Sequence, residues 1–288
     1  MSGRKLIIVL GPTAVGKTDY SIELALKHGS PVISCDSRQI YKEMTIGTAV
    51  PSAAQLSAVQ HYFIQTKSVT EYYTAGLYEA EALELINRLF DEGHETLVMT
   101  GGSMFYIDAV CNSLDHIPTA DLSVRAGLQA RLEREGIDSL KEDLARLDPV
   151  AYASMDLANS QRVFRAVEIC LSTGQPYSSF KERPSKAIRD FEIVKVGLTR
   201  PREGLYDRIN RRVVQMMDDG LVDEVKGLAR YRDLTALQTV GYKEIFDYMD
   251  GAVSMDEAVD LIQRNTRHYA KRQLTWWRRD PSIRWIEL

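Results

Sequence analysis

The segment GPTAVGKT at residues 11–18 fits the pattern GxxxxGK[ST] of a phosphate-binding loop. In such a loop successive main-chain N–H groups point at phosphate oxygens, and the N-terminus of the following helix adds a partial positive charge. Lys17 adds a full positive charge, and the Thr18 hydroxyl is placed to hold Mg²⁺. A nucleoside triphosphate is the common ligand, but any diphosphate meets the same electrostatic demand. The residues expected to bind the nucleotide or diphosphate are Gly11, Pro12, Thr13, Ala14, Val15, Gly16, Lys17 and Thr18.

Two more polar side chains follow short apolar runs. Asp36 comes directly after the run 31–35, and Ser103 follows the run 95–100 and two glycines that permit close main-chain approach to a ligand. Ligands of an open parallel sheet bind beyond the carboxyl ends of the strands, so both side chains are expected beside the phosphate-binding loop. There Asp36 could coordinate Mg²⁺ or act as a general base. The alternative for each residue is a helix N-cap.

A basic segment lies near the C-terminus. From Arg264 to Arg284 the chain has seven Lys or Arg residues and one acidic residue, Asp280. On a helix, four of the cations would fall within about 60° of one another: Arg264, Arg267, Lys271 and Arg278. The opposite side would carry Ile262, Tyr269, Trp276 and Trp277. We expect a helix that packs by its aromatic face and presents a basic stripe able to bind phosphates; the alternative is a solvated charged face.

The elements that must position these residues alternate between short apolar runs and helical patterns. Strands are expected at 5–10, 31–35 and 95–100, with helices at 17–27 and 78–90. Such alternation predicts an α/β fold in which crossover helices flank a parallel sheet. Together with the phosphate-binding loop, it predicts a core like that of the P-loop NTPases.

The middle of the chain differs from this pattern. Residues 121 to 180 show charged amphipathic patterns without a strand, whereas a strand at 191–198 and a helix at 202–217 restore the α/β character. We therefore predict an all-helical insertion domain at 117–190. The catalytic core, with mainly helical C-terminal residues, is predicted at 1–116 and 191–288.

The composition is that of an ordinary globular protein, with 44% hydrophobic and 26% charged residues and a net charge of −4. No apolar run approaches the length of a membrane span, and the N-terminal residues do not resemble a signal peptide. Cys35, Cys111 and Cys170 lie far apart, which argues against a zinc site or a disulfide framework. We expect a cytoplasmic protein that does not bind membranes.

The chain resembles the tRNA dimethylallyltransferases, also called tRNA isopentenyltransferases, over nearly its whole length. Three blocks carry the resemblance: GPTAVGKT at 11–18, SCDSRQIYKEMTIGTAVPS at 34–52 and TGGSMFY at 100–106. Further matches lie at 148–149, 159–166, 208–220, 239–243 and 269–278. The second block is far more specific than the phosphate-binding loop, which many families share.

The resemblance implies transfer of a dimethylallyl group from dimethylallyl diphosphate to N6 of the adenosine at position 37, next to the tRNA anticodon. The phosphate-binding loop would then hold a prenyl diphosphate in place of ATP, with Mg²⁺ as cofactor. Asp36 becomes the general base, and Lys17 and Arg212 stabilise the leaving diphosphate, although Arg211 beside it leaves the register open. Ser103 stands where many members have Thr, so we expect the hydrogen bond to survive and the packing to loosen.

The resemblance also implies that the chain, expected to be a monomer, binds the tRNA anticodon stem-loop. The family takes the adenine into a channel between its core and its helical insertion. The residues that match its tRNA contacts are Asp36, Ser37, Arg38, Gln39, Ser103, Gln161, Arg162, Val163, Phe164, Arg165, Val240, Gly241, Tyr242 and Lys243. Arg264, Arg267 and Lys271 of the basic stripe are expected to contact the tRNA backbone.

Two other classes of protein would use the same loop. A small-molecule or nucleotide kinase needs the loop, Mg²⁺ and basic residues for phosphoryl transfer, but it has no use for a long basic helix. A nucleotide-switched RNA-binding protein would lack prenyl chemistry. The block at 34–52 favours the prenyltransferase over both, on the strength of the resemblance.

Overall fold

The structure is a computed structural model that describes residues 3–113, 118, 121–180 and 189–288. The chain divides into two compact units, the first comprising Met1–Cys111 and Ile188–Leu288 and the second Asn112–Ala187. The borders predicted from the sequence lie at 117 and 190. Residue 117 lies outside the described residues, and Asp190 belongs to the first unit.

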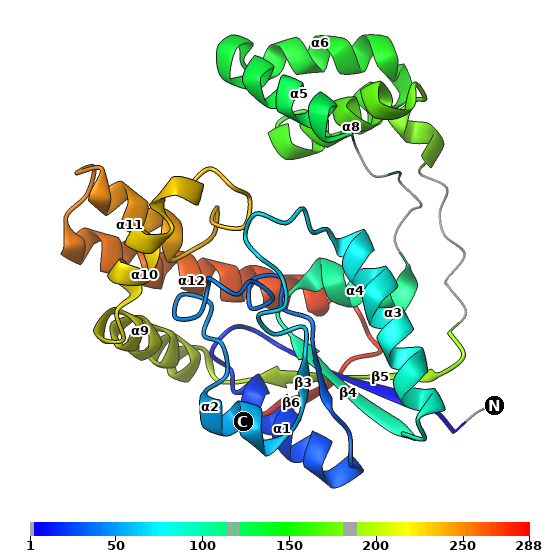
Figure 1. The fold of residues 1–288 in the computed structure, drawn as a ribbon, viewed down its shortest axis with the longest axis vertical. Coiled ribbons are helices and arrows are strands. Elements are labelled where there is room, and N and C mark those ends of the chain that lie inside the picture. The colour runs from blue at the N-terminus through cyan, green and yellow to red at the C-terminus, as the bar shows by residue number, and fades with distance from the viewer. Residues whose placement is uncertain (1–2, 114–117, 119–120, 181–188) are drawn as a thin grey trace. The chain divides into compact units, whose positions relative to one another are not determined.

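The first unit is built on a sheet of six parallel strands in the order β3-β2-β4-β1-β5-β6 (Figure 1). The strands are β1 (Lys5–Leu10), β2 (Val32–Ser34), β3 (His61–Tyr62), β4 (Thr96–Gly101), β5 (Glu192–Thr199) and β6 (Arg284–Glu287). The central strand β1 pairs in parallel with β4 on one side and with β5 on the other. The predicted parallel α/β core is thus confirmed. The two edge strands, β3 and β6, were not predicted.

Both faces of the sheet are covered by helices, which explains why its central strands are apolar throughout. Leu6, Ile8 and Leu10 of β1 face the apolar cluster formed with α3 (Ala75–Asp91) and α4 (Met104–Asn112). Ile7 and Val9 face the other cluster, which α1 (Lys17–His28), α9 (Arg202–Asp218) and α12 (Met255–Trp277) complete. Alternate side chains of β1 therefore pack against different helices on the two faces of the sheet.

A second group of helices packs against the loop that follows β2. These helices are α10 (Leu221–Gly227), α11 (Tyr242–Met249) and the first half of α12, with the short η2 (Ala229–Tyr231) between α10 and α11. Ile40 and Met44 of the loop are fully buried in the same apolar cluster as Tyr242 and Ile245. The remaining short helix, α2 (Ala53–Ala58), follows this loop and begins with a capping box made by Ser52 and Gln55.

The second unit is helical between residues 121 and 180, as predicted. It contains α5 (Leu122–Glu135), α6 (Ile137–Leu147), α7 (Pro149–Ser154), α8 (Ser160–Thr173) and the short η1 (Tyr177–Phe180). Its core is formed by apolar side chains of α5 to α8. The buried Asp148 accepts hydrogen bonds from Ala151 N–H and from both the N–H and hydroxyl of Ser178, so it caps α7 and ties η1 to it.

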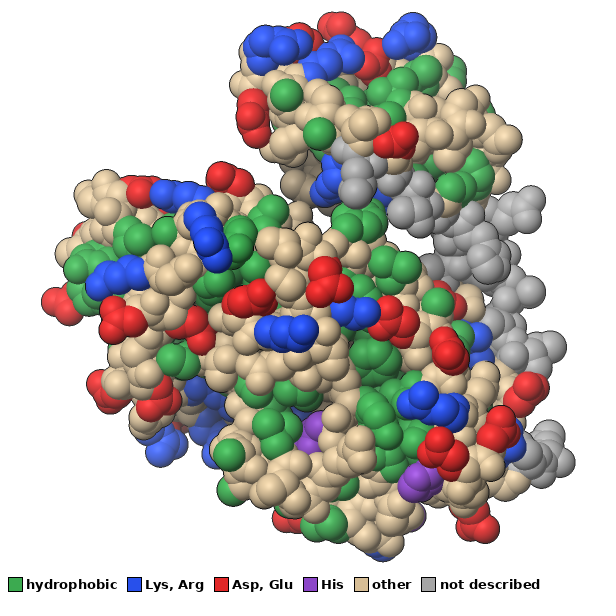
Figure 2. Space-filling view, in the orientation of Figure 1, with side chains coloured by type: hydrophobic (Ala, Val, Ile, Leu, Met, Phe, Trp, Pro, Cys, Tyr) green, Lys and Arg blue, Asp and Glu red, His purple; other side chains and the backbone are tan. Residues whose placement is uncertain are grey.

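Charged side chains of both signs are interspersed on the face of the molecule drawn in Figure 2. Within the described part of the chain, no helix combines the length and the apolar character that crossing a bilayer requires.

Candidate active site

The phosphate-binding loop joins β1 to α1, as the sequence predicted. Gly11 and Gly16 both have positive φ, and the loop curls around the side chain of Lys17. The Lys17 ammonium donates to the main-chain oxygens of Gly11 and Pro12, each at 2.9 Å. Burial lowers the pKa of Lys17 to about 8, the nearby Asp36 only partly opposing this shift. The loop therefore holds a costly buried cation that an anionic ligand would stabilise.

A cavity of about 590 Å³ opens beside this loop, and we call it the phosphate-loop cavity. Its polar residues include Lys17, Thr18 and Asp36, and its apolar residues include Ile46 and Met216. One end is bordered by Ser52 and Gln55, and the Gln55 amide donates to Asp19 of α1 at 2.7 Å. A site with charged and apolar walls suits a ligand that carries a phosphate group at one end and a hydrocarbon at the other.

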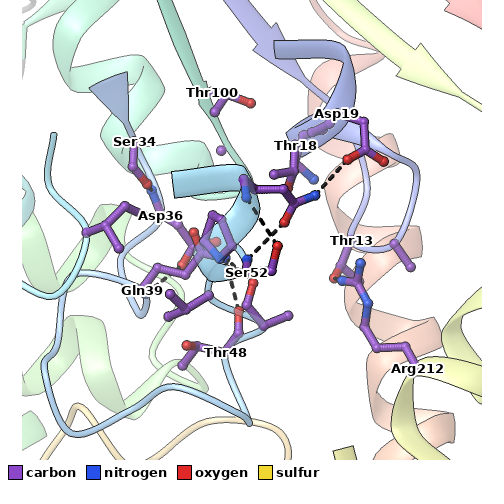
Figure 3. A pocket seen from close by; sticks show the side chains of 18 of the residues that line it. Thr13, Thr18, Asp19, Ser34, Asp36, Gln39, Thr48, Ser52, Thr100 and Arg212 are labelled. Atoms are coloured by element: carbon purple, nitrogen blue, oxygen red, sulfur yellow. Dashed lines mark hydrogen bonds between the residues drawn. The ribbon is translucent and has the colours of Figure 1, made fainter. Parts of the chain in front are cut away.

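Two arginines of α9, Arg208 and Arg212, line the cavity, and Arg212 lies on the side opposite Asp36 (Figure 3). Arg208 donates to Ala14 O at 2.8 Å, and Arg212 lies 3.5 Å from the Thr13 hydroxyl. Burial, reinforced by Arg208, lowers the pKa of Arg212. Arg211, by contrast, is exposed and pairs with Asp207 at 2.5 Å. Of the two adjacent arginines, it is Arg212 that faces this cavity.

Asp36 lies two residues after the end of β2, at the carboxyl edge of the sheet. Its Oδ1 accepts from the main-chain N–H of Arg38 at 2.9 Å and of Gln39 at 3.3 Å. Within the described chain no donor binds Oδ2, so one oxygen holds the turn and the other can accept a proton. Residues 37–40 form a turn, so the helix N-cap considered for Asp36 is not formed. Holding this turn through Oδ1 is compatible with the role of a base at Oδ2.

Ser103 connects the third loop to the Asp36 turn. Its hydroxyl oxygen accepts from Ser37 N–H at 2.8 Å and donates to the Ser37 hydroxyl at 2.9 Å. The residue is 8% exposed. The predicted hydrogen bond of Ser103 is present, and it lies within the protein, where it orders the residue that follows Asp36.

The two glycines before Ser103 were expected to allow close approach of a ligand, but protein atoms occupy that space. A Cβ on Gly101 would lie 2.6 Å from the main chain of Cys35, and one on Gly102 would lie 2.6 Å from Nε2 of Gln273. Gln273 donates to Gly102 O at 2.9 Å and accepts from Thr13 N–H at 2.9 Å. These glycines therefore let strands β2 and β4 and helix α12 meet closely.

A second cavity of about 600 Å³ adjoins the first, and we call it the adjoining cavity. The residues that line both cavities are Thr13, Asp36, Thr48, Ala49, Arg212 and Met216. Ser37, Arg38, Val240, Gly241 and Lys243, all predicted to contact tRNA, line the adjoining cavity only. Asp36 thus stands where two spaces meet, one beside the phosphate-binding loop and one beside the segment 240–243.

Tyr242 differs from its neighbours in that segment. Its side chain is fully buried and its hydroxyl donates to Glu224 at 2.6 Å, so the expectation that its side chain contacts tRNA is wrong. Gln39 also has internal partners, since its amide donates to Thr48 O at 3.1 Å and Ala49 O at 2.9 Å.

The basic stripe of α12 is only partly as predicted. Arg264 and Lys271 are exposed. Arg267, however, donates to Asn210 on α9 at 2.6 Å and lies 6.0 Å from the centre of the Tyr206 ring. The expectation that Arg267 points outward is wrong because α9 packs against this side of α12.

The segment 161–165 lies on α8 of the second unit. Gln161 and Arg162 are exposed, and Arg165 pairs at 2.6 Å with the fully buried Glu168, which Arg125 also contacts. Val163 and Phe164 are buried in the core of the unit. The prediction that these two side chains contact tRNA is wrong, because they form the apolar face of an amphipathic helix.

Several residues of the site were not found from the sequence: Arg200, Arg208, Glu224, Arg272 and Gln273. Arg200 donates to Val15 O at 2.8 Å, and Arg272 lines the adjoining cavity. Gln273 carried a usable signal, since a polar residue four positions after Tyr269 falls on the apolar side of the predicted helix. Glu224 carried none, because its partners in the loop 45–47 lie nearly 180 residues away.

Comparison with known proteins gives concordant matches. The model of the family described as IPP transferase matches residues 39–280. The tRNA dimethylallyltransferase 1 of Bacteroides thetaiotaomicron is 49% identical over 281 residues, which cover 98% of this chain and 91% of the relative.

Two solved structures are also similar. The full-length tRNA isopentenylpyrophosphate transferase of Bacillus halodurans has a TM-score of 0.71 at 39% identity, covering 99% of this chain and 90% of that one. A eukaryotic dimethylallyltransferase acting on tRNA has a TM-score of 0.82 at 24% identity, covering 99% of this chain and 74% of that one. At that identity the second likeness concerns the fold.

Proposed function

The chain belongs to the IPP transferase family, and from this premise we propose that it is a tRNA dimethylallyltransferase. The reaction moves the dimethylallyl group of dimethylallyl diphosphate to N6 of the adenosine at position 37 of tRNA and releases diphosphate. One observation carries the proposal most: the phosphate-loop cavity and the adjoining cavity meet at Asp36, Thr13 and Arg212. A donor and an acceptor could therefore approach each other at a carboxylate.

The phosphate-loop cavity supports binding of the prenyl diphosphate. The main-chain N–H groups of the loop, Lys17 and Arg212 would contact the diphosphate, and Ile46 and Met216 would face the hydrocarbon. Negative charge grows on the diphosphate as the bond between C1 and oxygen breaks. Preorganised cations and N–H donors stabilise that charge more in the transition state than in the ground state.

Mg²⁺ fits this site as a metal that the diphosphate brings with it. Among the described residues no group of three or more His, Cys, Asp or Glu side chains could form a metal site on its own. Thr18 lines the cavity and supplies a hydroxyl oxygen, and Mg²⁺ is commonly held by one or two protein oxygens together with phosphate and water. The metal would neutralise charge on the departing diphosphate.

Asp36 is proposed as the general base. As the adenine N6 lone pair forms the new bond to C1, the nitrogen must lose a proton, and Oδ2 of Asp36 can accept it. The acceptor base would reach this oxygen through the adjoining cavity, past Arg38, Val240 and Lys243. Ser103 orders the same turn by binding Ser37.

Incubation with dimethylallyl diphosphate, Mg²⁺ and an unmodified anticodon stem-loop with three consecutive adenosines tests the proposal. We expect N6-prenylated adenosine, detected by mass spectrometry of the digested RNA. ATP-dependent phosphorylation of a small acceptor without a prenylated product would favour a kinase and refute the transferase. The cytoplasmic setting, the monomeric state and the tRNA contacts of the second unit stay predictions.

A further inference from the structure

The loop 45–49 forms a wall that the two cavities share, because Thr48 and Ala49 line both. Whatever holds this loop in place acts on the space for the donor and on the space for the acceptor at once. The groups proposed to bind diphosphate lie elsewhere, on the phosphate-binding loop and on α9.

Glu224 on α10 holds the loop through its carboxylate. Oε2 accepts from the main-chain N–H of Thr45 at 2.9 Å and of Ile46 at 2.7 Å, and Oε1 accepts from that of Gly47 at 3.0 Å. The fourth donor is the Tyr242 hydroxyl, 2.6 Å from Oε1. A carboxylate only accepts hydrogen bonds when ionised, so it matches a place where four donors converge.

Tyr242 fixes the far side of this contact. A Cβ on Gly47 would lie 2.5 Å from the Tyr242 ring, so the loop rests directly on the ring and only glycine fits. Burial, reinforced by Glu224, raises the pKa of Tyr242 and so favours the protonated hydroxyl that donates to Glu224. Loop, carboxylate and ring thus form one continuous set of contacts.

The other end of the loop is tied to the proposed general base. Gln39 donates from its side chain to Thr48 O and Ala49 O, and from its main chain to Oδ1 of Asp36 at 3.3 Å. Figure 3 shows Gln39 between Asp36 and Thr48. A continuous series of hydrogen bonds and covalent links thus runs from Glu224 to Asp36 through the shared wall.

We propose that Glu224 is a positioning residue for prenyl transfer, which acts by holding the shared wall and, through Gln39, the Asp36 turn. This inference rests on the proposed function. Transfer requires C1, N6 and the base to lie within a fraction of an ångström of the reactive geometry, whereas charged groups bind diphosphate and RNA over longer distances. Loss of Glu224 should therefore slow the chemical step much more than it weakens binding.

Glu224→Gln tests the inference, because it places an amide NH₂ beside main-chain N–H groups of the loop 45–47, which can only donate. We expect the single-turnover rate of transfer to fall by about tenfold to a hundredfold. The dissociation constants of pyrophosphate and of the stem-loop should change by less than about threefold. Glu257→Gln is the matched control: its carboxylate accepts from Ser254 N–H at 2.7 Å at the exposed start of α12, and its loss should leave the rate unchanged.

A second variant decides the case in which Glu224→Gln does not fold. Tyr242→Phe removes one hydrogen bond from the carboxylate and keeps the ring under Gly47, and it should show a smaller loss of rate in the same direction. If the wild-type chain transfers prenyl groups and the folded variants match its rate, the inference fails while the proposed function stands. If substrate binding falls as much as the rate, Glu224 is a structural residue of the binding site and the inference fails as well. Absence of any prenylated adenosine from the wild type refutes the proposed function itself, and the inference with it.

Discussion

The side-chain oxygen of Gln273 lies 2.9 Å from the main-chain nitrogen of Thr13, so α12 holds the phosphate-binding loop from 260 positions away along the chain. The same side chain donates to Gly102 O, and it is 1% exposed. Gln273→Leu should leave the main-chain N–H of Thr13 without this acceptor and Gly102 O with the Tyr269 hydroxyl as its remaining side-chain donor, at a cost of about 1–3 kcal/mol for the unsatisfied N–H before relaxation. Denaturant unfolding and pyrophosphate titration should both show the loss. Gln263→Leu, at a partly exposed position of the same helix, should change neither.

Two substitutions separate the two roles of Asp36. Asp36→Asn keeps an oxygen that can accept from Arg38 and Gln39 but removes the base, so turnover should fall by about two to four orders of magnitude at nearly unchanged tRNA affinity. Asp36→Ala also releases the turn and should show, in addition, weaker acceptor binding. Single-turnover kinetics and stem-loop titrations measure both. Turnover by Asp36→Asn at the wild-type rate would exclude Asp36 as the base.

Lys17 gives the binding of diphosphate a defined pH dependence. Because burial lowers its pKa to about 8, the free protein loses this charge as the pH rises through 8, and a bound anion raises the pKa again. The affinity for pyrophosphate should therefore decline above pH 8, and binding at pH 8.5 should take up protons. Calorimetry in two buffers of different ionisation enthalpy measures the uptake. Pyrophosphate itself also titrates, and this contribution is present with Lys17→Met as well. The difference in proton uptake between the wild type and Lys17→Met is therefore the contribution of Lys17.

Arg212 and Arg211 offer a matched pair on one helix. Arg212→Ala removes a buried cation that faces the phosphate-loop cavity, and pyrophosphate affinity should fall by about tenfold to a hundredfold, as expected for charge-assisted hydrogen bonds. Arg211→Ala removes an exposed cation already paired with Asp207 and should have a minor effect. Equal losses for the two variants would mean that general charge, and not position, governs binding.

Two cations of α12, Lys271 and Arg267, should likewise differ in the effect of their substitution. Lys271→Ala should weaken stem-loop binding and reduce its dependence on salt concentration by about one charge, without affecting pyrophosphate. Arg267→Ala should chiefly lower the melting temperature, because its side chain joins α12 to Asn210 and Tyr206 of α9. Melting curves and binding measured at several salt concentrations distinguish the two. A larger reduction in the salt dependence for Arg267→Ala than for Lys271→Ala would reverse their assignments.

Local sequence patterns predicted the parallel sheet and its flanking helices well. The apolar runs of β1, β4 and β5 are long enough to be recognised, and the glycines and Lys17 mark the loop between β1 and α1. The two residues of β3 and the four of β6 escaped prediction, because so short a strand is defined by its neighbours in the sheet.

Contacts between distant segments set the limit for the site. The sequence placed Asp36, Ser103 and Lys17 at one edge of the sheet by the general rule for parallel strands. It did not show that Val163, Phe164 and Tyr242 are buried. These residues were chosen because their segments match the tRNA-contact segments of the family, and such a match does not tell which side chains point inward. The partners of Gln273 and Glu224 depend on the packing of α10 and α12, which no local pattern encodes.

The shared wall at 45–49 has a consequence for how such an enzyme can change. Its donor preference and its acceptor preference are not separate traits, because Thr48 and Ala49 line both cavities and the loop that carries them is held at residues 45–47 by one carboxylate. A substitution in the loop 45–49 that is selected for a longer prenyl chain would also alter the space offered to the acceptor adenine. New donor specificity should therefore emerge more readily from side chains that border the phosphate-loop cavity alone, such as Ile64 and Val50.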